Sequence, residues 1–300
     1  MMIAGANRTG ILMEAGGHLH GIFEAYRARK QDMPIAVFVG AHPLWSLGAL
    51  YSGPREGGEY DVIGGLLGEP LLVVASRVDP GLHVPAAAEL VLEGRVSHTE
   101  TIREGPFGEF TGYGTGVTQT PVFTVEVMTH RQDFVFQDIV SGRMEHLVLS
   151  VPALEERTLR VVKGVCPGVQ RIALVAPLTS IVAIDKQDDD EPRRVIDAVL
   201  RSHIYAKHVI VVDADVDPGD LRQVMVAVAL QTQADRKVHI LSGEQGTPLD
   251  PSVRDADGTT AKMGIDATGP LQPARTFTRN AIPSEVLEAI DVREFLRKKR

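Results

Sequence analysis

The hydrophobic and polar positions divide the chain into two halves of different character. Between residues 70 and 150, short apolar or alternating runs rich in Val, Phe and Thr are separated by glycine and proline. These runs predict an all-β barrel or sheet, with strands in PLLVVAS, ELVLEGRVS, VFTVEVMT and FVFQDIV. Upstream of them, the pattern predicts a helix at 20–31, a strand at 35–39, and loops at 41–49 and 52–61.

After about residue 150, predicted strands and helices alternate. Strands are expected in RIALVAP, SIVAIDK, KHVIVVDADVD and KVHILSG, and helices in VPALEERTLRVVKGV, DDDEPRRVIDAVLRSH and DPGDLRQVMVAVALQTQ. The helix at 188–203 is well marked, because acids and Pro192 stand at its start and apolar residues recur at helical spacing. Such alternation is typical of an α/β domain. We therefore predict an α/β (α+β) protein with a β-rich domain over 1–150 and an α/β domain over 151–300.

Composition narrows the function classes. The 300 residues carry a formal charge of −8, and this acidity counts against nucleic acid as the main partner. The apolar runs are too short for a membrane span, which needs roughly 18 residues. Cys166 is the single cysteine, so no disulfide forms within the chain and the cytoplasm is the expected location. With no base beside it in sequence, Cys166 is interpreted as a buried structural thiol.

The most informative segment for chemistry is REGPFGEFTGYG at 103–114, which holds Glu104 and Glu109 among glycines. Two carboxylates this close in a turn-rich loop are suited to general acid–base work, since each perturbs the pKa of the other. Glycines on both sides let the backbone approach a ligand closely. On spacing alone, however, a solvated loop that happens to contain two acids is the simpler interpretation.

Five motifs change that balance: EGPFGEFTGY at 104–113, VPAAAELVLEG at 84–94, KHVIVVDADVDPGDLRQV at 207–224, LDPS at 249–252 and KMGIDAT at 262–268. In order and spacing they resemble the UbiD-type decarboxylases, which use prenylated flavin mononucleotide (FMN). The resemblance implies that the β-rich half is part of a split-barrel flavin-binding domain.

The resemblance also implies roles for the two glutamates. Glu109 would donate a proton to the carbon that loses CO₂, while Glu104 would orient an arginine and stabilise the charged network. A buried carboxylic acid and a flavin electron sink are what decarboxylation needs.

In this family the flavin phosphate is held through a divalent metal, commonly Mn²⁺, with a monovalent ion such as K⁺ nearby. The resemblance places a glutamate metal ligand on Glu59, and leaves His18, with His20 as a rival, for the histidine ligand. Oxygen and imidazole ligands suit such a metal. Lys262 matches a position in the family's motif, from which the side chain is expected to reach the flavin phosphate from the second domain; its alternative is an exposed loop lysine. We expect Glu59, Glu104 and Glu109 to share one cleft.

The family's N-x-G-x-Y-R stretch, which carries a metal-binding asparagine and the catalytic arginine, would precede MMIAGANRTG and is not in this sequence. Asn7 and Arg8 do not match it. The leading function is non-oxidative, reversible decarboxylation of an aromatic or α,β-unsaturated carboxylic acid, with weak flavin binding and poor turnover expected of this chain alone. The alternative is a non-catalytic or complementing subunit of a UbiD-like complex. Either a homo-oligomer or assembly with a related subunit is expected.

Overall fold

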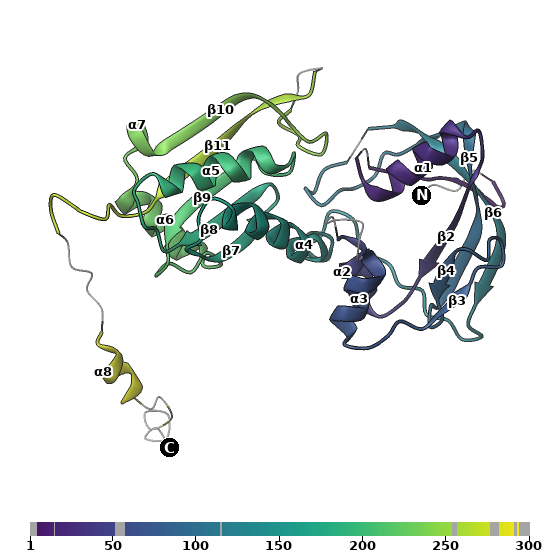
Figure 1. The fold of residues 1–300 in the computed structure, drawn as a ribbon, viewed down its shortest axis with the longest axis horizontal. Coiled ribbons are helices and arrows are strands. Elements are labelled where there is room, and N and C mark those ends of the chain that lie inside the picture. Colours follow the sequence, from purple (N-terminus) through teal and green to yellow (C-terminus); the bar gives the residue numbers. More distant parts are fainter. Residues whose placement is uncertain are drawn as a thin grey trace. The chain divides into compact units, whose positions relative to one another are not determined.

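The computed structural model describes residues 5–14, 16–51, 58–114, 116–253, 257–276, 282–290 and 293 of the chain. The chain forms two compact units, Met1–Thr268 and Gly269–Arg300. Figure 1 shows the elements of both units along the chain. The predicted loop at 52–61 falls largely outside the described residues, because 52–57 are not among them.

The first half of the larger unit is built on an antiparallel sheet. Within the described residues, four strands pair in the order β1-β6-β5-β2, and β3 pairs with β4 in a separate ribbon. The strands are β1 (Arg8–Gly10), β2 (Met33–Val39), β3 (Val73–Ala75), β4 (His83–Pro85), β5 (Leu90–Glu104) and β6 (Thr118–His130). Helix α1 (His18–Ala28) covers one face, where Phe23 packs with Met33, Val96 and Phe123. This β-rich half was predicted, although β1 was not.

Two sequence expectations in this half are wrong. The expected loop at 41–49 contains helix α2 (Pro43–Ala49), which is followed by α3 (Glu59–Leu67). Pro43 starts the helix rather than breaking it, since a first-turn proline lacks only an N–H that would have no partner. The expected strand FVFQDIV is not a strand; the backbone N–H of Val135 donates to Glu89 Oε2 at 3.0 Å instead of to a neighbouring strand.

The second half of the larger unit is an α/β layer structure. Its described strands pair in the order β10-β11-β9-β8-β7, with β9 parallel to both β8 and β11 and the outer pairs antiparallel. The elements are α4 (Met144–Lys163), β7 (Val169–Ala176), β8 (Thr179–Ile184), α5 (Glu191–Ser202), β9 (His208–Asp213), α6 (Leu221–Gln231), α7 (Ala234–Lys237), β10 (Val238–Gln245) and β11 (Thr259–Ala267). The predicted α/β class is confirmed.

The core of this half follows the predicted helical spacing. The α5 residues Val195, Ile196, Val199 and Leu200 are all fully buried and pack against the sheet. Cys166 is buried in the same cluster, as predicted, and burial raises the pKa of its thiol. Helix α4 begins at Met144 rather than at 151, so the predicted division near residue 150 falls within a helix.

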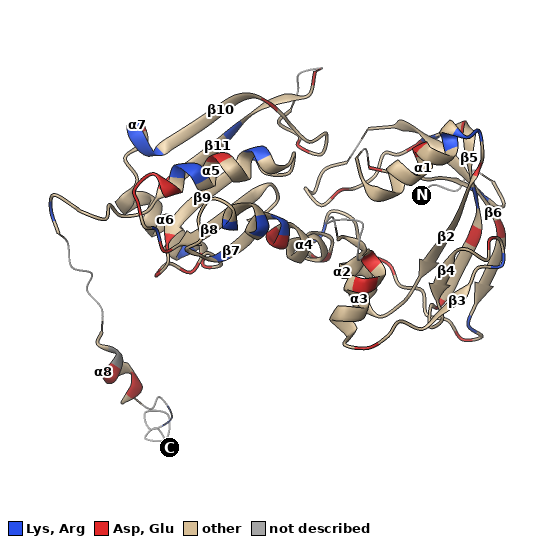
Figure 2. Cartoon of the chain, viewed as in Figure 1, with Lys and Arg blue, Asp and Glu red and all other residues tan. Residues whose placement is uncertain are grey.

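In the smaller unit, the described residues form one short helix, α8 (Ser284–Glu288). Acidic and basic residues are interspersed along the elements, with Lys and Arg visible on α4, α5 and α7 (Figure 2). Among the helices that the structure describes, none combines the length and apolar character needed to cross a membrane.

Candidate active site

Glu104 ends strand β5 as a buried carboxyl, with 1% of the residue exposed. Thr120 Oγ1 on the neighbouring strand β6 donates a hydrogen bond to Glu104 Oε2 at 2.8 Å. The carboxyl of Glu104 also lies against Gly10 of strand β1, where a Cβ would stand 2.7 Å from Oε2. The site therefore needs a residue without a side chain at position 10. Three strands fix one acidic side chain in a single orientation.

Glu109 lies in the loop that leaves β5. Gly105 opens this loop with φ +99°, a conformation that favours glycine, and a Cβ there would meet the Gly116 carbonyl oxygen at 2.7 Å. The backbone N–H of Glu109 donates to the Tyr113 carbonyl at 2.9 Å, and the N–H of Gly112 returns to the Glu109 carbonyl at 2.8 Å. The Glu109 side chain is half-buried. It can therefore exchange protons with water, whereas Glu104 is shielded.

His18 and Glu59 meet although 41 positions separate them in sequence. His18 is the first residue of α1 and Glu59 the first of α3, and His18 Nδ1 lies 2.7 Å from Glu59 Oε1. His20 instead faces along its own helix, with Nε2 4.0 Å from the Glu24 carboxylate. Of the two histidines that the sequence left open, His18 is the one in contact with Glu59.

A cavity of about 640 Å³ surrounds this pair. It is closed by residues from both halves of the larger unit, and a volume of this size suits a nucleotide-sized ligand. The polar and charged side chains that line it are Glu14, His18, His20, Tyr51, Glu59, Arg157, His203 and Tyr205.

The two motif glutamates do not line this cavity; Glu59 does. Glu109 approaches it through its neighbour, because the ring of Phe110 lies 5.9 Å from that of Tyr205, centroid to centroid. Burial and the hydrogen bond to Glu14 raise the pKa of the Tyr205 hydroxyl, and the charge of Glu109 adds to the effect. The expected single cleft for Glu59, Glu104 and Glu109 therefore stays a prediction.

Lys262 lies on β11 and is 3% exposed, so it is not the exposed loop lysine that was its alternative. Its Nζ donates to the carbonyls of Leu200 at 2.7 Å and His203 at 3.2 Å, which ties β11 to the end of α5. Burial lowers the pKa of this amine. A role for Lys262 at a flavin phosphate remains a prediction.

Two family models match the chain. The 3-octaprenyl-4-hydroxybenzoate carboxy-lyase Rift-related domain matches residues 1–144, and the C-terminal domain of the same carboxy-lyase matches residues 150–267. The chain belongs to the UbiD family. The resemblance found in the five sequence motifs is thereby confirmed.

Characterised relatives and solved structures agree with this UbiD assignment. Anhydromevalonate phosphate decarboxylase of Methanothermobacter thermautotrophicus is 34% identical over 93% of this chain, and that of Aeropyrum pernix is 33% identical over 94%. The chain spans 66% and 64% of the length of these two relatives.

Among solved structures, the UbiD-class enzyme HmfF from Pelotomaculum thermopropionicum in complex with FMN superposes with a TM-score of 0.90 at 34% identity, covering 98% of this chain and 66% of that one. The vanillic acid decarboxylase of Sedimentibacter hydroxybenzoicus superposes with a TM-score of 0.83 at 29% identity, covering 98% of this chain and 66% of that one.

Sequence reasoning missed three cavity residues of this UbiD-family chain: Arg157, His203 and Tyr205. Arg157 lies on α4, while the other two follow the end of α5. No motif marks them, because Arg157 is one of several arginines on an amphipathic helix. Only the HIY run directly after the α5 pattern offers a signal, since aromatic and imidazole side chains there must pack beside the sheet.

Proposed function

We propose that this chain is a decarboxylase that removes CO₂ from an α,β-unsaturated or aromatic carboxylic acid with the help of prenylated FMN. The observation that carries the proposal is the His18–Glu59 contact of 2.7 Å inside a cavity of about 640 Å³. The relatives named above are decarboxylases, so the alternative of a non-catalytic subunit is not favoured.

The donor set of this cavity fits a metal-bridged phosphate. One imidazole nitrogen and one carboxylate oxygen are acceptable ligands for Mn²⁺ or a similar divalent ion. Among the described residues, no group of three or more His, Cys, Asp or Glu side chains gathers into a metal-ligand cluster. His18 and Glu59 would therefore hold the metal together with oxygen atoms of the ligand's phosphate, and a K⁺ ion nearby would balance further charge. Lys262, which we also propose at the phosphate, does not line this cavity and would have to exchange its bonds to the Leu200 and His203 carbonyls to reach the phosphate.

Glu109 is assigned to proton transfer. The bond between the substrate carbon and its carboxylate breaks, CO₂ leaves, and the carbon takes the proton of the Glu109 carboxylic acid. When bound, prenylated FMN would supply the electron sink for that carbon. Half-buried Glu109 then regains its proton from water. Glu104, whose carboxyl is held by the hydrogen bond from Thr120, would provide a fixed polar group beside the reacting atoms.

The substrate class follows from the relatives as a finer proposal. The two curated relatives at 33% and 34% identity are named for a phosphorylated acid, whereas the vanillic acid decarboxylase at 29% identity is named for an aromatic one. We therefore place a phosphorylated, α,β-unsaturated acid first and an aromatic acid second.

The test is CO₂ release by the purified 300-residue chain reconstituted with prenylated FMN and Mn²⁺. The panel contains anhydromevalonate phosphate, the same acid without its phosphate, vanillate and cinnamate. We expect the phosphorylated acid to be turned over faster than the others, at the low absolute rate expected of this chain alone. Turnover confined to vanillate or cinnamate would move the assignment to aromatic acids, and no CO₂ from any acid by flavin-loaded protein would contradict the proposed activity.

We also propose that the chain works in the cytoplasm and that its two domains divide near residue 150. We propose further that it assembles, either with copies of itself or with a related subunit. Solved relatives include an evolved dimeric form of HmfF and the ShVdcCD vanillic acid decarboxylase. Among the described strands the sheet ends at β2, and this supports association, because the edge of a sheet offers backbone groups to a second chain.

A further inference from the structure

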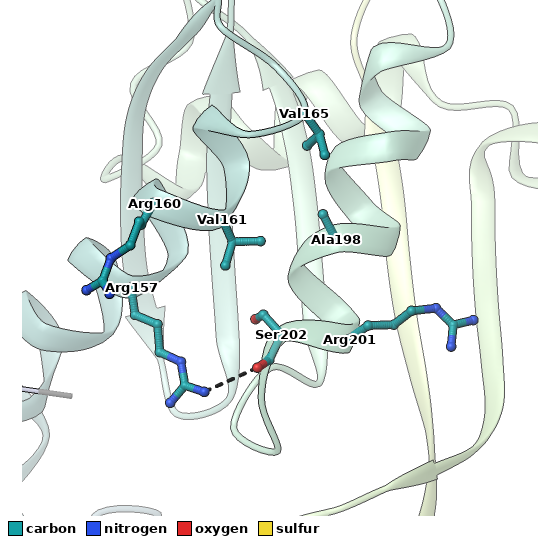
Figure 3. Close-up of a pocket in the computed structure, with 7 residues that line it drawn as sticks. All are labelled: Arg157, Arg160, Val161, Val165, Ala198, Arg201 and Ser202. Atoms are coloured by element: carbon teal, nitrogen blue, oxygen red, sulfur yellow. Dashed lines mark hydrogen bonds between the residues drawn. The ribbon is translucent and has the colours of Figure 1, made fainter. Parts of the chain in front are cut away.

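Arg157 on α4 lines the cavity, and no neighbouring carboxylate among the described residues neutralises the charge of its guanidinium. Its Nη2 donates to the Ser202 carbonyl at 3.2 Å, as the dashed line in Figure 3 shows. Among the described residues, no carboxylate lies within ion-pair distance of its guanidinium, whereas nearby Arg160 pairs with Glu156 and Arg201 with Glu244. A guanidinium carries more N–H donors than one carbonyl can use.

His203 supplies a second donor beside it. Its Nδ1 accepts a hydrogen bond from the backbone N–H of Tyr205 at 3.2 Å, so the neutral ring carries its proton on Nε2. That Nε2 is buried and has no hydrogen-bond partner among the described residues. Burial, together with the charges of Arg157 and Lys262, lowers the pKa of His203 to about 4, which keeps the ring neutral. A buried donor without a partner is rare, and it suggests a ligand.

Arg157 and His203 are both among the residues that line the cavity of the His18–Glu59 pair. Of its described lining residues, Arg157 alone is a lysine or arginine, and the carboxylates Glu14 and Glu59 line it as well. A phosphate monoester fits this arrangement better than a carboxylate does. A phosphate monoester has one terminal oxygen more than a carboxylate, so it could accept from a guanidinium and an imidazole N–H and still offer oxygens to a metal that His18 and Glu59 would hold.

We propose that Arg157 and His203 form an oxyanion-binding pair for the phosphate monoester of the cavity's ligand. The inference rests on the proposed function, which brings two such phosphates to this cavity: that of the flavin nucleotide and that of a phosphorylated substrate. Arg157 and His203 are positioning residues, which hold the ligand while the motif glutamates carry the chemistry.

Arg160 provides a matched control. It lies one turn along α4 from Arg157 and lines the same groove against α5, but it extends away from Ser202 in Figure 3 and does not line the cavity. Arg160→Gln therefore removes an equal charge from the same helix without touching the proposed pair.

The experiment is a calorimetric titration of the 300-residue protein with Mn²⁺ present, using FMN, riboflavin and 3-methylbut-2-enyl phosphate as ligands. The proteins are wild type, Arg157→Gln, Arg157→Lys, His203→Asn and Arg160→Gln, each checked for folding by thermal unfolding. Asn at 203 retains an acceptor for the Tyr205 N–H but removes the Nε2 donor.

We expect Arg157→Gln to weaken FMN binding at least tenfold and His203→Asn to weaken it severalfold, with partial recovery in Arg157→Lys. Riboflavin, which lacks the phosphate, should bind all variants alike, and Arg160→Gln should match wild type. A loss seen only with the alkenyl phosphate would assign the pair to the substrate's phosphate. Equal affinities of wild type and Arg157→Gln for both phosphates would overturn the inference, whereas a wild type that binds neither would overturn the proposed function itself.

Discussion

At the scale of single residues, His203 links burial to stability. Its folded pKa of about 4 lies below the usual 6.5, so between these values the unfolded chain binds a proton that the folded protein does not. The free energy of unfolding must therefore fall as the pH falls through this window, by about 2 kcal/mol from pH 7 to pH 4.5. Urea unfolding at both pH values should show a smaller loss for His203→Asn than for wild type.

His208 and His239 form a common background in this comparison, because burial lowers the pKa of each in both proteins. Identical pH dependence of the free energy of unfolding in wild type and His203→Asn would show that His203 is protonated normally in the fold, and the argument for a neutral ring would fail.

The His18–Glu59 contact gives a second prediction. Mn²⁺ titration followed by electron paramagnetic resonance should show at least tenfold weaker binding in His18→Ala, since one of two protein ligands is lost. His20→Ala is the matched control, because His20 lies on the same helix and lines the same cavity but faces Glu24. Loss of Mn²⁺ affinity in His20→Ala with no effect of His18→Ala would reverse the assignment.

Site residues could be predicted from the sequence where they share one contiguous motif, and could not where they come together only in the fold. Glu104 and Glu109 stand in one contiguous motif, so the sequence could identify them before any fold was known. Arg157 and His203 come from separate elements and share a cavity only through tertiary packing. Nothing in their local spacing distinguishes them from a helix-surface arginine and a post-helix histidine.

At the scale of elements, the packing of α5 on β11 depends on Gly264. A Cβ at this position would lie 2.1 Å from Cγ2 of Ile196, which is fully buried. Gly264→Ala should therefore lower the free energy of unfolding by about 1–3 kcal/mol. Ile196→Ala alone should cost about 2–5 kcal/mol through its cavity, and the double variant should lose less than the sum.

Urea unfolding of the four proteins in this cycle measures the coupling. Gly65→Ala in α3 serves as the control, since a Cβ there meets no atom within 4 Å. If the two substitutions change the free energy of unfolding by strictly additive amounts, Gly264 and Ile196 are not in tight contact and the packing argument fails.

Element prediction worked where one strong pattern decided the structure. The amphipathic spacing of α5 and the apolar strand β9 were read correctly because burial imposes the same periodicity that the sequence shows. Helix α2 was missed because Pro43 and Gly48 resemble loop residues. In the structure Pro43 opens the helix, and Gly48 lets it approach Ile63, where a Cβ would stand 2.2 Å away.

At the scale of the whole molecule, the family's fold was predictable because five motifs in fixed order constrain the chain more strongly than any single element does. Association is the open expectation at this scale. Light scattering at micromolar concentration should give a mass above the 32.5 kDa of one chain, since β2 ends the sheet among the described strands and offers an edge for pairing. A monodisperse monomer would contradict it.

The most direct test of the account compares CO₂ release by wild type and Glu109→Gln, each reconstituted with prenylated FMN and Mn²⁺ to the same occupancy. Glu126→Gln is the control, because Glu126 is a carboxylate on β6 that pairs with Arg95 away from the cavity. We predict measurable turnover by wild type and the control, at the low rate expected of this chain alone, and a loss of at least about 100-fold in Glu109→Gln, since general acid catalysis contributes about 10²–10⁴-fold. Undiminished CO₂ release by Glu109→Gln at equal flavin occupancy would contradict the assignment of proton transfer to this residue.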